Sequence, residues 1–132
     1  MKIKKLDDKK IEIDLPREEL RWFSQALNEC CNGLRIKDFV ATIGAGDAEL
    51  ERMLDQVGEM YQAPIGHESK LGVAKISEEN FRMTLKPSDA RIFVNCMKET
   101  LAQLGDWEYQ TRMGAKAEQI KTVIASLEAA LR

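Results

Sequence analysis

Polar side chains recur at four-residue intervals in two segments of the chain, and they are the first candidates for chemistry. The two sets are Arg21, Gln25 and Glu29, and Arg91, Asn95 and Glu99. Residues four apart share one face of a helix, so each set predicts a polar ladder, and the two ladders could form a symmetric pair of recognition faces. In the alternative interpretation each arginine pairs with an acid of its own segment, for which Asp38 and Glu108 are the matched candidates.

The groups that could perform catalysis lack the neighbours that catalysis needs. His67 is the only histidine and lies beside Glu68 in a segment typical of a solvent-exposed linker. A general base or metal ligand needs partners that hold it in place. The chain contains no GxSxG, HExxH or GxGxxG motif, and the Gly-Ala-Gly run at 44–46 lacks the lysine and hydroxyl residue of a phosphate loop. We therefore predict a protein that is not an enzyme, with no catalytic residues, no cofactor and no metal site.

The cysteines favour a reducing compartment. Cys30, Cys31 and Cys96 are odd in number and lack the spacing of metal ligands. Adjacent cysteines on a helix point about 100° apart, which suits neither a disulfide nor a shared metal. The N-terminal segment 1–8 has no apolar region of the kind found in signal peptides. These features predict structural thiols and a cytoplasmic location.

Composition disfavours several classes of protein. The chain has 132 residues, of which 44% are apolar and 32% charged, a balance typical of globular rather than disordered proteins. Its net charge of −2 argues against a nucleic-acid partner, because general nucleic-acid binders carry a basic excess. No run approaches the roughly twenty apolar residues of a membrane span, so we expect no membrane association.

The segments that carry the two ladders match each other along most of their length. When residues 71–131 are aligned with residues 1–61, without a gap, most apolar positions face apolar positions. Identical pairs in this alignment include Lys5 and Lys75, Leu15 and Leu85, Arg21 and Arg91, Phe23 and Phe93, Glu29 and Glu99, Leu34 and Leu104, and Gly44-Ala45 and Gly114-Ala115. The match predicts an internal duplication with copy 1 at 1–61, a linker at 62–70 and copy 2 at 71–132, the two copies sharing one core.

Each copy begins with a predicted β-hairpin. Apolar residues alternate with polar ones in both copies, at Ile11, Ile13 and Leu15 and at Phe81, Met83 and Leu85. This period of two indicates strands with one buried face. Shorter strands at 2–6 and 72–76 precede them, joined by polar connectors at 7–9 and 77–79. Because a lone hairpin is only marginally stable, we predict that the two hairpins join into one four-stranded antiparallel sheet.

Three helices are predicted after each hairpin. Apolar stripes at three- and four-residue steps mark the long helices, at Leu20, Phe23, Leu27, Cys31 and Leu34 and at Ala90, Phe93, Met97, Leu101 and Leu104. Pro16 and Pro87 mark their starts, while Asn32-Gly33 and Gly105 mark their ends. The remaining predicted helices are short turns over 38–43 and 108–113 and third helices over 50–61 and 120–131.

The short turn and the third helix of each copy have the spacing of a helix-turn-helix, which makes a DNA-binding regulator an alternative function. In copy 1, Arg52 is the one basic residue of the second helix among five acids, Asp47, Glu49, Glu51, Asp55 and Glu59. DNA phosphates would repel such a helix. A helical hairpin packed for structural reasons is therefore the favoured interpretation.

Trp107 departs from the match between the copies. It faces Lys37 in the alignment, whereas Trp22 faces the apolar Ile92 and is interpreted as structural. A tryptophan outside the shared core pattern, at a junction of loop and helix, is the leading candidate for a contact residue, with core filling as the alternative. The candidate partner-binding set is Trp107, Arg21, Gln25, Arg91 and Asn95.

Two stretches resemble short bacterial proteins of unknown function. Residues 25–33 are similar to the asparagine-rich helix of those proteins, and residues 107–114 to their aromatic-x-Thr-Arg-apolar-Gly turn. Each such protein resembles one copy of this chain. Copy 1 departs from the turn pattern, with Ala41-Thr42 where Thr-Arg is expected. The resemblance implies a bacterial origin and brings no activity or site residue with it.

Taken together, these features predict an α+β protein of two ββααα copies related by an approximate two-fold axis. The favoured function is a non-catalytic, cytoplasmic protein-protein interaction module, such as an immunity-type inhibitor or a regulatory adaptor. The alternatives are a DNA-binding regulator and a small-ligand binder in the groove between the copies. We expect a monomer or a homodimer.

Overall fold

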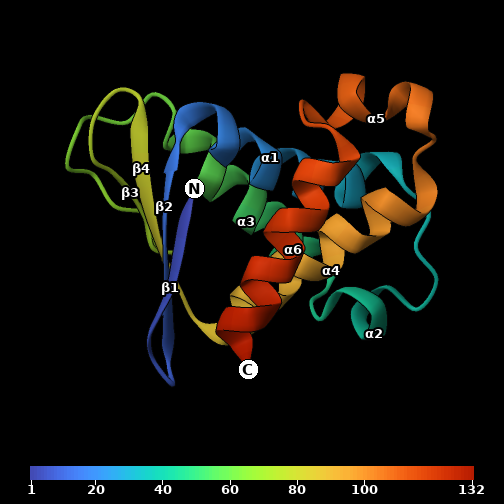
Figure 1. Cartoon of the computed structure of the whole chain (residues 1–132), viewed down its shortest axis with the longest axis horizontal. Helices are drawn as coiled ribbons and strands as arrows, with labels where there is room; N and C mark the ends of the chain where they lie inside the picture. Colours follow the sequence, from blue (N-terminus) through green and yellow to red (C-terminus); the bar gives the residue numbers. More distant parts are fainter.

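The computed structural model describes all residues, 1–132, and has an α+β architecture in which helices cover one face of a four-stranded antiparallel sheet (Figure 1). The strands are β1 (Lys2–Asp7), β2 (Lys10–Pro16), β3 (Val73–Lys75) and β4 (Asn80–Leu85). Their order in the sheet is β1-β2-β4-β3, so the two hairpins meet along β2 and β4. The predicted α+β class and the joining of the hairpins into one four-stranded antiparallel sheet are confirmed.

The two central strands pair about a midpoint at which Ile13 lies opposite Met83. On either side of it, Ile11 pairs with Leu85 and Leu15 with Phe81. These side chains are all buried against the helices, as the alternation predicts. The opposite face of the sheet is polar and carries an ion-pair network that joins Lys4, Glu12, Arg82 and Asp14.

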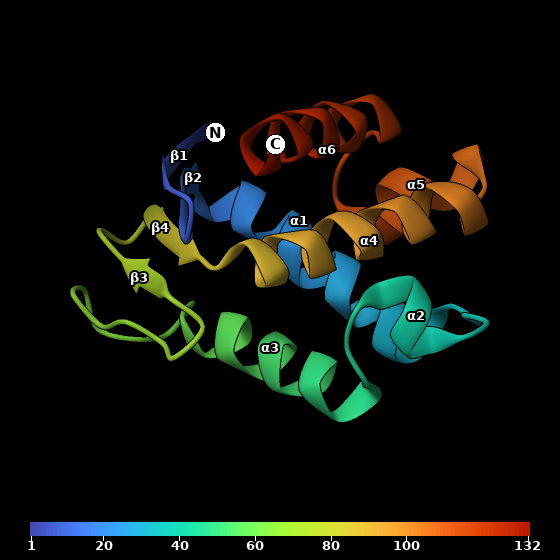
Figure 2. The same ribbon diagram turned by 90° about the horizontal axis from the view of Figure 1, so that it is seen from below.

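The helices form a layer in which α1 and α4 lie at the centre (Figure 2). The helices are α1 (Arg17–Asn28), α2 (Phe39–Ile43), α3 (Asp47–Glu59), α4 (Pro87–Gln103), α5 (Asp106–Met113) and α6 (Ala117–Leu131). α3 packs on α1 and α6 packs on α4. None of these helices combines the length and the apolar character that a membrane crossing would require.

Several helix boundaries differ from the sequence prediction. The third helices each begin three residues earlier than predicted, at Asp47 and Ala117, and α3 ends at Glu59. The first long helix does not continue as an α-helix to Asn32-Gly33, because its last turn is the π-helical segment η1 (Glu29–Gly33). A Cβ atom at Gly33 would collide with the Glu29 carboxylate, so the bare glycine leaves room for that side chain to fold back. The short helix predicted from residue 108 begins at Asp106, since the Glu108 carboxylate accepts the Gly105 N–H at 3.3 Å and closes the first turn.

A single hydrophobic cluster of 33 buried residues holds the layers together. Where α1 crosses α4, the rings of Phe23 and Phe93 meet edge to face with their centroids 5.2 Å apart. Most of the predicted stripe residues belong to this cluster. Cys31, Leu34 and Leu101 do not, because they are only partly buried at its margin.

The segment predicted as a linker, 62–70, is in part a component of the sheet edge. Gly66 donates a backbone hydrogen bond to Lys75, and Ser69 donates one to Val73, each at 2.8 Å. Lys75 is buried and its ammonium group donates to the carbonyl oxygens of Tyr61 and Ala63 at 3.2 and 2.8 Å. These bonds tie the end of α3 to β3.

Gly72 is the position at which the backbone most clearly requires glycine. Its φ is +103°, and a Cβ atom there would overlap the backbone oxygen of Thr84. We expect Gly72→Ala to lower the free energy of unfolding by about 2 to 3 kcal/mol. Gly58→Ala is the matched control, since Gly58 lies in α3 with open space around it. That variant should instead gain about 0.5 to 1 kcal/mol in urea denaturation. Equal effects of the two substitutions would contradict this account.

Candidate functional site

The candidate site lies at the end of the molecule farthest from the sheet, where α2 and α5 are found (Figures 1 and 2). We call this surface the helical end and define it as α2, α5 and the loops 34–38 and 104–105. It carries two exposed large apolar side chains, Trp107, which is 87% exposed, and Val40, which is 63% exposed. The exposure of Trp107 excludes the core-filling interpretation.

Trp107 is placed by the first turn of α5. Its indole ring lies against Gly105, where a Cβ atom would come within 3.0 Å of the indole Nε1. Deeper in the helix, Tyr109 is buried, and a hydrogen bond of 2.8 Å joins its hydroxyl to that of Thr100 on α4. These contacts fix the position of α5 and therefore the position of Trp107 in its first turn.

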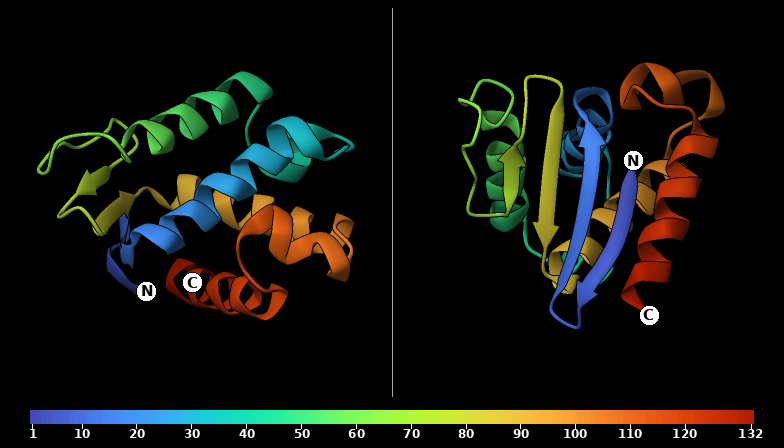
Figure 3. Two further views of the ribbon diagram at one scale, coloured as in Figure 1. Left: turned by 90° about the horizontal axis from the view of Figure 1, so that it is seen from above. Right: turned by 60° about the vertical axis from the view of Figure 1, so that its left-hand side comes forward.

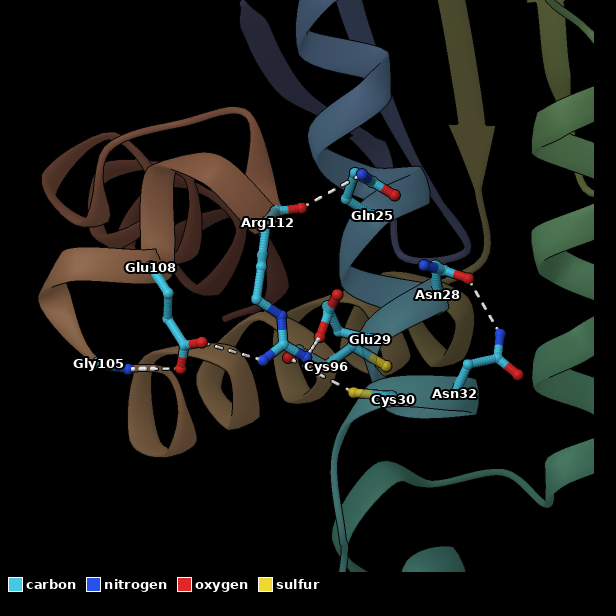
Figure 4. A network of polar contacts seen from close by, with 9 residues as sticks. All are labelled: Gln25, Asn28, Glu29, Cys30, Asn32, Cys96, Gly105, Glu108 and Arg112. Atoms are coloured by element: carbon cyan, nitrogen blue, oxygen red, sulfur yellow. Dashed lines mark hydrogen bonds and ion pairs between the residues drawn. The ribbon is translucent and has the colours of Figure 1, made fainter.

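A polar network fixes α5 to the end of α1 (Figure 4). The carboxylate of Glu29, which is buried, forms an ion pair with Arg112. The same guanidinium contacts Glu108 at 3.4 Å. Gln25 donates from its side-chain amide to the Arg112 carbonyl oxygen at 3.2 Å. Because these groups come from α1, η1 and α5, the network sets the orientation of the Trp107-bearing helix.

The amides of the two predicted polar ladders have structural roles. Gln25 bonds the last turn of α5, and in the same way Asn95 donates to the Ile43 carbonyl oxygen in the last turn of α2 at 2.9 Å. Each amide thus holds the short helix of the other half of the chain. Gln25 and Asn95 are partly buried, so only part of each side chain is accessible to solvent.

The arginines of the ladders are exposed and form no ion pair, so the expected pairing with Asp38 or Glu108 is wrong. Glu108 instead binds Arg112, which is four residues along the same helix. The two free arginines line two open depressions. Arg21 lies with Ser24, Gln25 and Tyr61 around about 270 Å³, and the second, of about 320 Å³, is lined by Arg91, Val94, Asn95, Lys98, Glu128, Leu131 and Arg132.

Arg112 and Val40 are the residues of this region that sequence reasoning missed. Arg112 was part of the Thr-Arg turn pattern in residues 107–114, and that pattern gave no sign of its partner Glu29, which lies far away in sequence. Val40 faces the polar Gln110 in the alignment of the two segments. That mismatch, like the one at Trp107, is the signal that could have marked it as a surface residue.

The cysteine thiols are free, and the environment of two of them suppresses their reactivity. Burial, with a smaller contribution from Glu51, raises the pKa of Cys31 to about 11. A hydrogen bond with Cys30, together with burial, holds the pKa of Cys96 far above its ordinary value. Thiols with raised pKa values stay protonated at neutral pH and are poor nucleophiles. No three His, Cys, Asp or Glu side chains gather in a way that could hold a metal ion.

The two tyrosines provide a pH test of the packing. Burial raises the pKa of Tyr61 to about 12, against the smaller opposing effects of Arg21 and Arg17, and burial also raises the pKa of Tyr109. An unfolded tyrosine ionises near pH 10. Between about pH 10 and 12 the folded chain therefore binds more protons than the unfolded chain, so stability should fall as pH rises.

In the folded chain, we expect the ultraviolet absorbance of the Tyr61 tyrosinate to appear at a pH about two units higher than in urea. Ionisation of both tyrosines near pH 10 in the folded chain would contradict the burial described above.

The fold and the site together define an α+β protein with a four-stranded antiparallel sheet, one helical layer and an exposed tryptophan at the end far from the sheet. Comparison with protein-family models, curated proteins and solved structures finds no significant match to the chain. The function must therefore be inferred from the surface itself.

Proposed function

We propose that the protein is a non-catalytic protein-protein interaction module of the cytoplasm, an immunity-type inhibitor or a regulatory adaptor, that binds its partner through Trp107. The observation that carries this proposal is the 87% exposure of that tryptophan on an otherwise anchored helix. Burial of a whole indole in an interface removes about 150 to 250 Å² from water. Tryptophan is also among the residues that dominate binding energies in protein interfaces.

The anchoring of α5 supports the same proposal. Arg112 holds the helix to Glu29, and Tyr109 holds it to Thr100. A contact residue on a helix that is already fixed loses little conformational freedom on binding. Val40, on the separate helix α2, is a second exposed apolar side chain at the helical end.

We also propose that the chain is a duplicated unit with approximate two-fold symmetry. The supporting pairs are all separated by seventy residues: Ile13 and Met83 lie opposite each other in the sheet, the rings of Phe23 and Phe93 meet edge to face, and Gln25 and Asn95 each bond the last turn of a short helix in the other half. Trp107 has only Lys37 at the equivalent position. A duplicated scaffold with a single exposed tryptophan should bind one partner molecule per chain.

The charge of the surface favours a protein partner over DNA. The acids of α3, Asp47, Glu49, Glu51, Asp55 and Glu59, are all exposed. A helix with this face would be repelled by phosphates, so the helix-turn-helix spacing does not translate into a DNA-binding surface.

Site-specific photo-crosslinking in the native host tests the proposal. A benzophenone amino acid placed at position 107 should give one discrete adduct with a partner protein. The matched control is the same probe at Ile65, which is 58% exposed and lies before β3, away from the helical end. That control should give no such adduct. Absence of an adduct at 107, or the same adducts at both positions, would overturn the proposal.

A further inference from the structure

The outer edge of the sheet at β1 is not paired with a further strand, while α6 packs beside β1 and the Lys5 ammonium group donates to the Arg132 carbonyl oxygen at 3.2 Å. β1 pairs with β2 alone, and its backbone makes no other hydrogen bond. Every residue of the strand is exposed except Ile3, which is partly buried. Figure 3 shows β1 as the outermost strand, on the side of the sheet away from β3. Open edges offer a row of unpaired N–H and C=O groups to any extended segment that approaches.

The other edge of the same sheet is covered by an extended segment of the chain. Lys75 in β3 accepts a hydrogen bond from Gly66 at 2.8 Å and donates one to the His67 carbonyl oxygen at 3.0 Å. Val73 accepts another from Ser69. The segment 66–69 therefore shows how an added strand lies against this sheet.

The two edge strands, β1 and β3, pair with their neighbouring strands in the same register. Lys5 pairs with Ile11 on β2, and Lys75 pairs with Phe81 on β4, which are equivalent positions seventy residues apart. Because hydrogen-bonded and free residues alternate along an edge strand, the backbone groups of Ile3 and Lys5 must point outward, as those of Lys75 do. The irregularity in β1 lies between Lys5 and Asp7, so the part from Lys2 to Lys5 is regular.

The charge of β1 indicates what could pair with it. Lys2 and Lys4 lie on the polar face of the sheet, where Lys4 contacts Glu12 at 3.2 Å and Lys2 has no ion-pair partner. A second copy of β1 would bring lysines beside lysines, which disfavours self-association through this edge. A strand with carboxylates on that face would pair with both ammonium groups.

We propose that the β1 edge binds an extended segment of a partner protein that carries acidic residues at alternate positions. The segment adds a fifth strand through the backbone of Ile3 and Lys5, and its carboxylates lie beside Lys2 and Lys4. This inference does not rest on the Trp107 surface, which lies at the opposite end of the molecule (Figure 1).

A synthetic peptide tests it, acetyl-Glu-Val-Glu-Thr-Glu-Val-Glu-amide, titrated into the full chain and followed by amide NMR and hydrogen exchange. Binding should shift the β1 resonances and protect the outward amides of Ile3 and Lys5 from exchange. The same peptide with lysine in place of glutamate should cause neither effect. No change on β1 with the acidic peptide, or equal changes with both peptides, would overturn the proposal.

Two single charge reversals test whether the peptide pairs with β1 or is only attracted by the positive charge of the lysines. Lys2→Glu should weaken the peptide's affinity by about fivefold. Lys9→Glu is the matched control, because Lys9 is equally exposed, has no ion pair and lies in the hairpin turn; it should have little effect. Equal losses would contradict specific pairing, and so would a β1-mediated dimer of the free chain in sedimentation.

Discussion

Replacement of Phe23 by alanine is expected to lower the free energy of unfolding by about 3 to 5 kcal/mol. The ring is completely buried and meets the Phe93 ring edge to face where α1 crosses α4, so its loss leaves a cavity at the junction of the two halves. Urea denaturation followed by far-ultraviolet circular dichroism measures the effect. The transition should remain single, because one hydrophobic cluster contains residues of both halves.

Phe93→Ala is the matched variant and should cost a similar amount. The double variant should cost less than the sum of the two, by about 1 kcal/mol, because each single substitution already removes the ring-ring contact. Two separate transitions, with Phe23→Ala affecting only one of them, would contradict a core shared by residues 1–61 and 71–132.

Replacement of Trp107 by alanine is expected to weaken partner binding by about 30-fold to 1,000-fold, which corresponds to about 2 to 4 kcal/mol. The stability of the free chain should stay within about 0.5 kcal/mol, since an 87% exposed side chain contributes little to folding. The measurement is a calorimetric titration with the partner identified by crosslinking at position 107.

Trp107→Phe should bind the partner more tightly than Trp107→Ala does, because it keeps an aromatic ring at the same position of α5. Ile65→Ala removes an exposed apolar side chain away from the helical end and should leave binding unchanged. If Ile65→Ala were as damaging as Trp107→Ala, the interface would lie elsewhere.

The elements that local pattern determines could be predicted from the sequence. Alternation around Ile13 and Met83 predicts the central strands, and the apolar stripes through Phe23 and Phe93 predict the long helices. Both signals reflect one buried face per element, so tertiary packing and local periodicity agree.

The features that the sequence did not predict depend on contacts between distant residues. The π-helical turn at the end of α1 accommodates the carboxylate of Glu29, whose partner Arg112 is 83 residues away. The amides of Gln25 and Asn95 each bond a short helix from the other half of the chain. No periodicity within a single element encodes such pairings.

The candidate site was only partly predictable for a related reason. A tryptophan without an apolar counterpart indicates a surface role, and the structure exposes Trp107. The exposure of Val40 and the unpaired edge of β1 could not be predicted in this way, because both depend on which elements lie side by side. Segment 66–69 looks like a linker in the sequence, and only the sheet topology shows that it covers one edge and leaves the other free.

Fluorine NMR of the chain labelled with fluorotryptophan tests the central claim most directly, because the chain has two tryptophans and an unlabelled partner is silent. In the free protein, the Trp107 resonance should show the solvent isotope shift of an exposed ring, and the Trp22 resonance, from a side chain only 6% exposed, should not. On addition of the partner we predict that Trp107 loses its isotope shift and moves, while Trp22 stays unchanged. A Trp107 resonance that keeps its position and its solvent shift in the complex would contradict the proposed function.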